Sequence, residues 1–566
     1  MKIVFAPLSL LFVLFANAQE LTQTVKGQIT DDQSGQVIIG ATVLIANTSP
    51  PQGAITDAEG FYRIEEVPIG RQTIQVSYLG YESALFPGVL VGSGKEVILN
   101  VELTESLEQL EEVVVTSRSN TGLPINDMAS VSAISISVEE TSRFAATFDD
   151  PARAALTFAG VQTGGDDLLN EIVIRGNTPK GILWRLEGVE IQNPNHFGQI
   201  GSSAGGISML SSNVLSNSDF FTSAFPAQYG NATSGVFDLN LRKGNFDKNE
   251  TAFEVGLLGV GAALEGPLSK KSNASYLINY RYSTLALASN VGLDVLGEQE
   301  EVTFQDLSFK FFFPTKKFGS FSVWGLGGDN SYDFLPDRSV GETLYDEESQ
   351  RMGVAGITNV FYLTDDSYLE TVVSGSYQKI GDVEDSLRTL ITFEEDFIES
   401  QFRVSTLYNH KLSPRTTIRG GLIFSRLGYD LISREYSGFR STYDISIDED
   451  GRSNFYQSYF NWQYRPSSKL TINSGLHLSS FALNNKTYLE PRFGFQYRTS
   501  FGLFTGGAGL HSRMETVALY TAQQQLEDGS MVQNNRDLGF TRAMHSVLGF
   551  QAPIGSSGYR FKTEIY

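Results

Sequence analysis

The sequence predicts a mainly β protein with three parts: a small N-terminal β-sandwich, an α+β middle domain and an antiparallel transmembrane β-barrel. Apolar and polar residues alternate along most of the chain after residue 247, as expected for strands with one polar face. The 55 glycines, 24 tyrosines and 39 phenylalanines suit a β-rich protein with many turns and aromatic belts. With 566 residues the chain is too long for one hydrophobic core.

Residues 1–18 have the features of an export signal. Lys2 precedes an apolar run over residues 3–15, which is too short for a membrane anchor. Ala16 and Ala18 form an A-x-A cleavage site, so we expect the mature chain to begin at Gln19. The chain has no cysteine, which excludes disulfides, a lipidated cysteine and thiolate chemistry.

Residues 19–103 predict the β-sandwich. Short alternating runs are separated by Asp, Pro and Gly turns and lie at 25–29, 41–45, 60–64, 73–78 and 96–101. The segments 27–31, 40–43, 56–62 and 76–81 resemble the carboxypeptidase-regulatory-like domain. That domain is an appended sandwich and not the peptidase itself. The stretch contains no histidine and no zinc-binding constellation, so we expect no enzymatic activity.

Residues 104–120 form a linker with a strand-forming run. This run is Glu112, Val113, Val114, Val115 and Thr116. It is either the last strand of the sandwich or a free strand that adds to the sheet edge of a partner. It resembles a TonB box, which favours the second interpretation and implies the TonB energy-transducing complex as partner.

Residues 121–243 are rich in Gly, Asn, Ser and Ala. We expect a helix at 151–156, a strand at 172–174 and a strand pair over 183–191 around Glu187-Gly188. These segments, with 224–241, resemble the plug domain of TonB-dependent receptors. The sequence departs from that family at Glu187, where many plugs carry Asp before the glycine.

Residues 247–566 predict about fourteen strands of roughly ten residues. The alternation of apolar and polar residues in these strands is expected both for a soluble sandwich and for a membrane barrel. Strand length, aromatic residues at strand ends, and the alternation of tight turns with long polar stretches favour a barrel with a polar face toward a wet lumen. The long stretches are 284–301, 329–350, 428–452 and 513–539. The resemblance implies twenty-two strands, so we expect this barrel to be partial.

The motifs that suggest chemistry are weak. Gly201-Ser202-Ser203-Ala204-Gly205 matches a nucleophile elbow but lies in a loop-like context. The 448–451 run lacks the ligands of a calcium loop. The five histidines have no metal-ligand spacing. We therefore expect no enzyme activity, no cofactor and no metal site, and the net charge of −22 argues against nucleic acid.

A candidate ligand-facing loop contains Asn193, Asn195 and His196. Plug apices face the external mouth in the family that the sequence resembles, so these side chains either contact ligand or bond within the plug. The resemblance as a whole implies an outer-membrane receptor that imports a scarce small ligand of siderophore, vitamin, oligosaccharide or peptide class. Its plug and N-terminal domain face the periplasm, and its barrel contacts outer-membrane lipid. A passive porin, a signal transducer and a surface adhesin remain alternatives.

Overall fold

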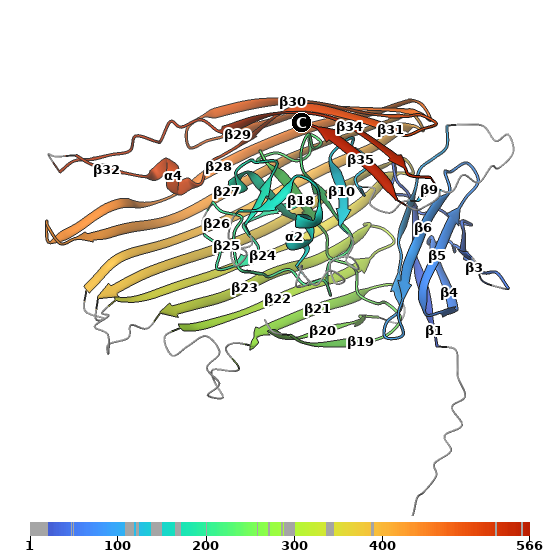
Figure 1. Cartoon of the computed structure of the whole chain (residues 1–566), viewed down its shortest axis with the longest axis horizontal. Coiled ribbons are helices and arrows are strands. Elements are labelled where there is room, and N and C mark those ends of the chain that lie inside the picture. Colours follow the sequence, from blue (N-terminus) through green and yellow to red (C-terminus); the bar gives the residue numbers. More distant parts are fainter. Residues whose placement is uncertain are drawn as a thin grey trace, which may run out of the picture. The chain divides into compact units, whose positions relative to one another are not determined.

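The structure is a computed structural model that describes most of the chain (Figure 1). The described residues are 21–46, 48, 50–107, 118–119, 124–136, 150–164, 171–199, 201–256, 259–269, 272–284, 287, 300–334, 344–386, 390–526, 529–555 and 559–566. They divide into two compact units. The first comprises the described parts of 1–31, 37–104 and 111–120, and the second those of 32–36, 105–110 and 121–566.

The first unit contains two small sheets with a shared apolar core. One sheet has the order β4-β1-β7 with β8 also paired to β1, and the other has the order β3-β2-β5-β6-β9. Val25, Val43, Ile74 and Val76 are fully buried because alternate residues of their strands face inward. The strands are β1 (Thr22–Asp31), β2 (Thr42–Ala46), β3 (Gln52–Ile55), β4 (Phe61–Pro68), β5 (Gly70–Ser77), β6 (Ala84–Val91), β7 (Val97–Ile98), β8 (Val101–Leu103) and β9 (Arg118–Ser119).

The second unit begins with an inner domain, residues 124–243. Its main sheet has the order β10-β17-β18-β13-β14, and the β13–β18 pair is parallel. The expected helix is present as one short turn, α2 (Pro151–Ala154), followed by a 3-10 turn. The strands are β10 (Ala133–Ile136), β11 (Val161–Thr163), β12 (Ile172–Ile174), β13 (Ile182–Leu186), β14 (Val189–Ile191), β15 (Asn195–His196), β16 (Ile207–Ser208), β17 (Ser218–Phe221) and β18 (Gly235–Leu239).

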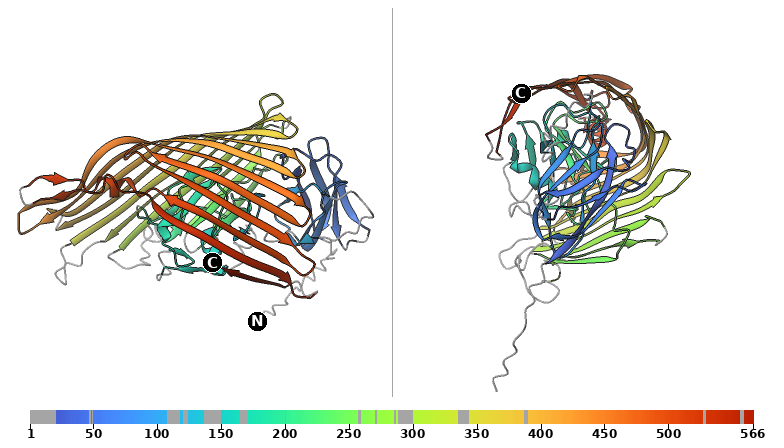
Figure 2. Two further views of the ribbon diagram at one scale, coloured as in Figure 1. Left: turned by 90° about the horizontal axis from the view of Figure 1, so that it is seen from above. Right: turned by 90° about the vertical axis from the view of Figure 1, so that its right-hand side faces the viewer.

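The described residues after 243 form fifteen antiparallel strands in one sheet, in which sequential strands pair except that β31 pairs with β34 across a separate hairpin. This curved sheet wraps around the inner domain (Figure 2). Its strands are β19 (Glu250–Val255), β20 (Gly259–Pro267), β21 (Ser275–Ser283), β22 (Glu300–Pro314), β23 (Ser320–Phe334), β24 (Leu344–Thr364), β25 (Ser367–Ser386), β26 (Leu390–Ser413), β27 (Thr416–Ser437), β28 (Thr442–Ser467), β29 (Leu470–Phe481), β30 (Lys486–Arg498), β31 (Leu503–Arg513), β34 (Thr541–Pro553) and β35 (Arg560–Ile565).

The predicted alternation of faces is confirmed along these strands. On β22, Asp306 and Ser308 are buried toward the inner domain, whereas Leu307 between them is exposed on the outer face. The tight turns expected at Ser413-Pro414 and Pro466-Ser467-Ser468 join β26 to β27 and β28 to β29. The sheet therefore has a polar side toward the inner domain and an apolar, aromatic side away from it.

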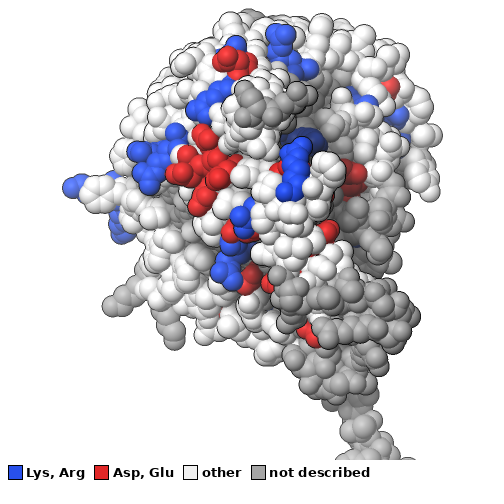
Figure 3. All heavy atoms as spheres, turned by 90° about the vertical axis from the view of Figure 1, so that its left-hand side faces the viewer, with Lys and Arg blue, Asp and Glu red and all other residues white. Residues whose placement is uncertain are grey.

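The strands are longer than predicted. β24 to β28 contain 20 to 26 residues each, and much of the expected 428–452 loop is strand. The acidic run 448–451 lies on β28 and not in a turn. Cross-strand ion pairs stabilise this polar extension, such as Arg434–Glu394, whereas the prediction treated polar stretches as loops. Figure 3 shows basic and acidic side chains interspersed on this end of the molecule. Residues 513–539 also contain α4 (Val517–Thr521), β32 (Gln524–Gln525) and β33 (Met531–Val532).

The inner face of the curved sheet is not polar throughout. On β23 and β24 the buried residues Trp324, Leu326, Met352 and Val354 belong to the same apolar cluster as Phe237 of the inner domain. The expectation of a uniformly polar face toward water was therefore wrong here, because the inner domain packs directly against this part of the sheet.

Candidate functional site: polar contacts between the inner domain and the curved sheet

The leading segment, residues 124–132, is the first described part of the inner domain after the linker. The Asp219 carboxylate accepts hydrogen bonds from the backbone N–H groups of Ile125 (2.8 Å) and Asn126 (2.7 Å). Burial raises the pKa of Asp219 to about 7, and the two backbone hydrogen bonds oppose this rise. Asp219 lies on β17, so the segment is fixed to the middle of the inner sheet.

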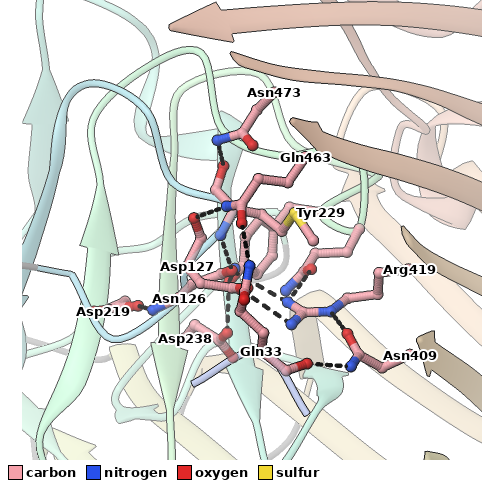
Figure 4. Close-up of polar contacts among 12 residues, drawn as sticks. Gln33, Asn126, Asp127, Asp219, Tyr229, Asp238, Asn409, Arg419, Gln463 and Asn473 are labelled. Atoms are coloured by element: carbon pink, nitrogen blue, oxygen red, sulfur yellow. Dashed lines mark hydrogen bonds and ion pairs between the residues drawn. The ribbon is translucent and has the colours of Figure 1, made fainter. Parts of the chain in front are cut away.

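Four strands of the curved sheet hold the same segment from the other side. Arg419 on β27 pairs with Asp127 at 3.0 Å, and the side-chain amide of Gln463 on β28 donates to the Asp127 carbonyl at 2.7 Å. The next two strands continue this row. The amides of Asn473 on β29 and Gln496 on β30 donate to the carbonyls of Met128 (3.0 Å) and Ala129 (3.0 Å). Figure 4 shows Arg419, Gln463 and Asn473 converging on the segment.

A hairpin of the inner domain is attached to the curved sheet by ion pairs. Glu187 adopts φ 50° and Gly188 φ 80°, which gives the tight turn between β13 and β14. Both carboxylate oxygens of Glu187 accept from Lys310 Nζ on β22 at 2.8 Å, in a pair that is almost fully buried. Glu190 pairs with Arg403 on β26 at 2.8 Å. The longer Glu side chain at position 187 thus has a partner on the sheet.

The loop 224–233 is held through its backbone. Arg492 on β30 donates to the carbonyls of Pro226 (2.6 Å) and Tyr229 (2.7 Å). His477 and His545 contact the carbonyls of Ala227 (2.7 Å) and Thr233 (3.0 Å). These contacts require a particular loop conformation and no particular loop side chain, so the loop sequence gives no sign of them.

The three predicted loop residues Asn193, Asn195 and His196 are all buried. The Asn195 amide donates to Asn193 Oδ1 at 2.7 Å, so the two asparagines bond within the loop. His196 contacts the curved sheet, with Nδ1 3.2 Å from Asn330 Oδ1 and Nε2 3.3 Å from Asp306 Oδ2. The structure places the three residues close together in one buried loop, and their role toward a ligand stays a prediction.

Two sets of predicted residues lie outside the described residues. These are the strand-forming run Glu112, Val113, Val114, Val115 and Thr116, and the cleavage-site residues Ala16, Ala18 and Gln19. Just after the first set, β9 (Arg118–Ser119) pairs in parallel with β6 of the first unit.

The residues that hold the inner domain could not be identified from the sequence. Asp127, Asp219 and Arg419 are ordinary polar residues there and gain partners only when segments 94 to 292 residues apart meet. Alternation predicts that Arg419 faces inward but does not identify its partner.

Within the described part of the chain, no group of three or more His, Asp or Glu side chains could hold a metal ion. No helix among those residues is long and apolar enough to cross a membrane.

Comparisons with known proteins match this architecture in both units. Residues 24–104 match the carboxypeptidase regulatory-like domain. A stretch of 242 residues is 24% identical to the TonB-dependent transporter Oar of Myxococcus xanthus. That match covers 41% of this chain and about a fifth (21%) of the length of the relative.

Solved structures resemble the chain over a larger part. The outer membrane transporter YddB of Escherichia coli is 13% identical with a TM-score of 0.56, and the match covers 75% of this chain and 67% of YddB. The siderophore receptor PirA of Pseudomonas aeruginosa is 14% identical with a TM-score of 0.54, over 77% of this chain and 74% of PirA. The chain has the fold of these outer-membrane receptors.

The contacts of the inner domain follow one another along the chain. The linker is followed by the leading segment, and the leading segment is followed by β10. Among the described strands β10 lies at the edge of the inner sheet and pairs only with β17. The part of the inner domain nearest the linker is thus held by polar contacts along its backbone, while Ala129 and Ile136 pack into apolar clusters.

Proposed function

We propose that the protein is a TonB-dependent outer-membrane receptor that actively imports a scarce extracellular ligand. The curved sheet is the wall of its transmembrane barrel, and residues 121–243 are its plug. TonB adds a strand to Glu112–Thr116 and pulls, because the outer membrane has no ATP of its own. The relative Oar, named as a TonB-dependent transporter, supports this proposal.

The leading segment is the observation that carries the proposal. A force applied at 112–116 first meets the pairing of β9 with β6, and within the inner domain it first meets the backbone of Ile125 and Asn126, which Asp219 holds. Arg419, Gln463, Asn473 and Gln496 bind the following residues on successive strands, so they are stretched one after another. A typical hydrogen bond adds about 1 kcal/mol to stability, so sequential release needs far less force than simultaneous rupture.

The ligand class stays open among siderophores, vitamins, oligosaccharides and peptides. PirA is named a siderophore receptor, and its likeness to this chain supports an iron carrier as the first class to test. The loop with Asn193, Asn195 and His196 is the part of the plug that we propose to respond to ligand, through the contacts of His196 with Asp306 and Asn330 on the wall.

Deletion of residues 111–117 tests the coupling. We expect cells with the deletion to bind radiolabelled ferric siderophore, cobalamin, oligosaccharide or peptide as the intact protein does, but to lose uptake to background. Deletion of the four residues 438–441, the turn that joins β27 and β28 more than 300 residues from the linker in the sequence, serves as the control. Uptake that survives deletion of 111–117 contradicts the proposal.

A proton uncoupler separates this function from a passive porin. Transport through a porin is insensitive to an uncoupler, whereas energised uptake stops. The filled interior argues against free diffusion, since Trp324, Met352 and Phe237 occupy the space between sheet and inner domain.

A further inference from the structure

The outer face of the curved sheet contains a groove of about 510 Å³. Its lining comes from β26 to β30 and is mainly apolar, with three hydroxyls on the outward-facing side chains. The outward-facing side chains among the lining residues are Thr406, Tyr408, Leu422, Ser458, Phe460, Leu476, Leu478 and Leu489. The volume lies within the range of ligand-binding pockets, about 300 to 1,000 Å³.

The groove is formed where Gly420 has no side chain. Tyr408 pairs with Gly420, Gly420 with Phe460, and Phe460 with Leu476, so these four residues form one outward row across four strands. The missing side chain at Gly420 leaves a notch between Tyr408 and Phe460. A Cβ added at Gly420 meets only ordinary contacts, the nearest being the Tyr459 carbonyl at 3.5 Å. The notch is therefore empty space and not a close approach of two backbones.

Two cations lie at the turns below the groove. Arg415 is in the turn between β26 and β27, and Lys469 is in the turn between β28 and β29. A guanidinium N–H of Arg415 donates to the Pro466 carbonyl, which directs Arg415 toward the turn that carries Lys469. Both side chains are exposed, and neither forms an ion pair with another described residue. The acidic pair Asp365-Asp366 in the β24–β25 turn bounds this cationic region on one side.

The spacing between the cations and the groove fits within one leaflet of a membrane. Gly420 is five residues from Arg415, which is about 17 Å along a strand and, at a tilt of about 45°, about 12 Å along the membrane normal. Half the hydrocarbon thickness of a bilayer is about 15 Å. A phosphate held at Arg415 and Lys469 therefore places an acyl chain of the same molecule at the notch.

We propose that this groove is a binding site for an anionic glycerophospholipid of the periplasmic leaflet. Its phosphate binds Arg415 and Lys469, and one acyl chain lies over Gly420 between Tyr408 and Phe460. The inference rests on the proposed transmembrane function, and the groove is continuous with the apolar outer face that this function assigns to lipid.

Native mass spectrometry of the intact protein tests the site, with phosphatidylglycerol and phosphatidylethanolamine as probes. We expect the wild type to retain one phosphatidylglycerol at least about tenfold more than phosphatidylethanolamine. Arg415→Gln with Lys469→Gln should remove this preference, and Gly420→Leu should reduce retention of both lipids. Gly375→Leu is the matched control, since Gly375 is an outward glycine on β25 with no atom closer than 4.0 Å to an added Cβ.

Equal retention of the two lipids by the wild type, or equal retention by wild type and Gly420→Leu, overturns the inference. Heat-modifiable mobility and insertion into liposomes are measured on the same samples. Proteins that insert but show no lipid preference contradict the lipid site alone. Failure of the wild type to insert contradicts the proposed function and the lipid site together.

Discussion

At the scale of single residues, Asp219 is the most informative side chain of the inner domain. It is almost completely buried and holds two backbone N–H groups of the leading segment. Burial of a carboxylate disfavours its charged form, so its hydrogen bonds only partly offset the lost hydration. Asp219 thus combines an attachment with an ionisable group whose pKa is close to physiological pH.

We predict that the stability of the inner domain falls as pH rises from about 4 to about 7. The folded protein keeps the proton on Asp219 up to about pH 7, whereas the unfolded chain releases it near 3.8. The unfolded state therefore binds fewer protons in this window, and the unfolding free energy decreases with pH until it levels off above 7. The total decrease in the unfolding free energy is at most about 4 kcal/mol, since a shift of one pKa unit corresponds to about 1.4 kcal/mol.

A single introduced cysteine can report the local opening of the inner domain, because the chain has no cysteine of its own. Ala129 is buried in the leading segment, and the labelling rate of Ala129→Cys in urea at each pH gives the opening free energy. The Asp219→Asn variant should lose this part of the pH dependence. An unchanged pH profile in that variant excludes Asp219 as its source.

At the scale of elements, the hairpin over β13 and β14 was predictable from the sequence. Glu187-Gly188 between two apolar runs is a local turn signal, and the structure confirms a strand pair there. The inward and outward faces of β22 and β28 were predictable for the same reason, because alternation is a local property.

The strand extensions of β24 to β28 are rich in charged residues and were therefore predicted as loops. Tyr443, Ile445 and Ile447 nevertheless alternate with polar residues on β28, which is a local sign of the strand found in the structure. The partner of Glu187, by contrast, could not be read locally. Lys310 is 123 residues away and meets it only after the sheet has formed.

The buried Lys310–Glu187 pair should be essential for attachment of this hairpin. Lys310→Met leaves the Glu187 carboxylate buried without its cation, which costs on the order of 3 to 5 kcal/mol. We expect labelling of a Val189→Cys reporter to accelerate accordingly, and the double variant Lys310→Met with Glu187→Gln to recover most of the protection.

Lys379→Met is the matched control for that experiment. Lys379 pairs with Asp396 at 3.0 Å, but both side chains are more than one third exposed, so removal of the pair should cost less than about 1 kcal/mol. Equal effects of the two Lys→Met changes would show that the Glu187 hairpin is not held by its ion pair.

At the scale of the whole molecule, the proposed function raises the question of which part of the plug moves during transport. Two disulfide tethers can distinguish a mechanism in which only the leading segment is released from one in which the entire plug leaves the barrel. A Cβ added at Gly494 lies 2.6 Å from Ser130 Cβ, and one added at Gly507 lies 3.0 Å from Ala224 Cβ. In each pair the two Cβ atoms must move apart by about 1 Å to reach the distance found in disulfides.

We predict that the Ser130→Cys, Gly494→Cys tether blocks uptake until a reductant is added. The Ala224→Cys, Gly507→Cys tether should leave uptake within about twofold of the wild type, because the loop 224–233 lies beyond the segment that is pulled first. The measurement is ligand uptake before and after reduction, with the single-cysteine variants as controls. If both tethers block uptake, the plug leaves as one body.

Under the proposed function, the length of β24 to β28 affects how a ligand approaches the plug. A strand of 26 residues is about 85 Å long and, at a tilt of about 45°, rises about 60 Å, twice the hydrocarbon thickness of a bilayer. In the proposed membrane position, a wall of this height extends beyond the hydrocarbon on a frame of hydrogen-bonded strands. A solute that enters along it meets strand side chains before it meets the plug, so substitutions at those side chains can alter substrate preference without loop remodelling.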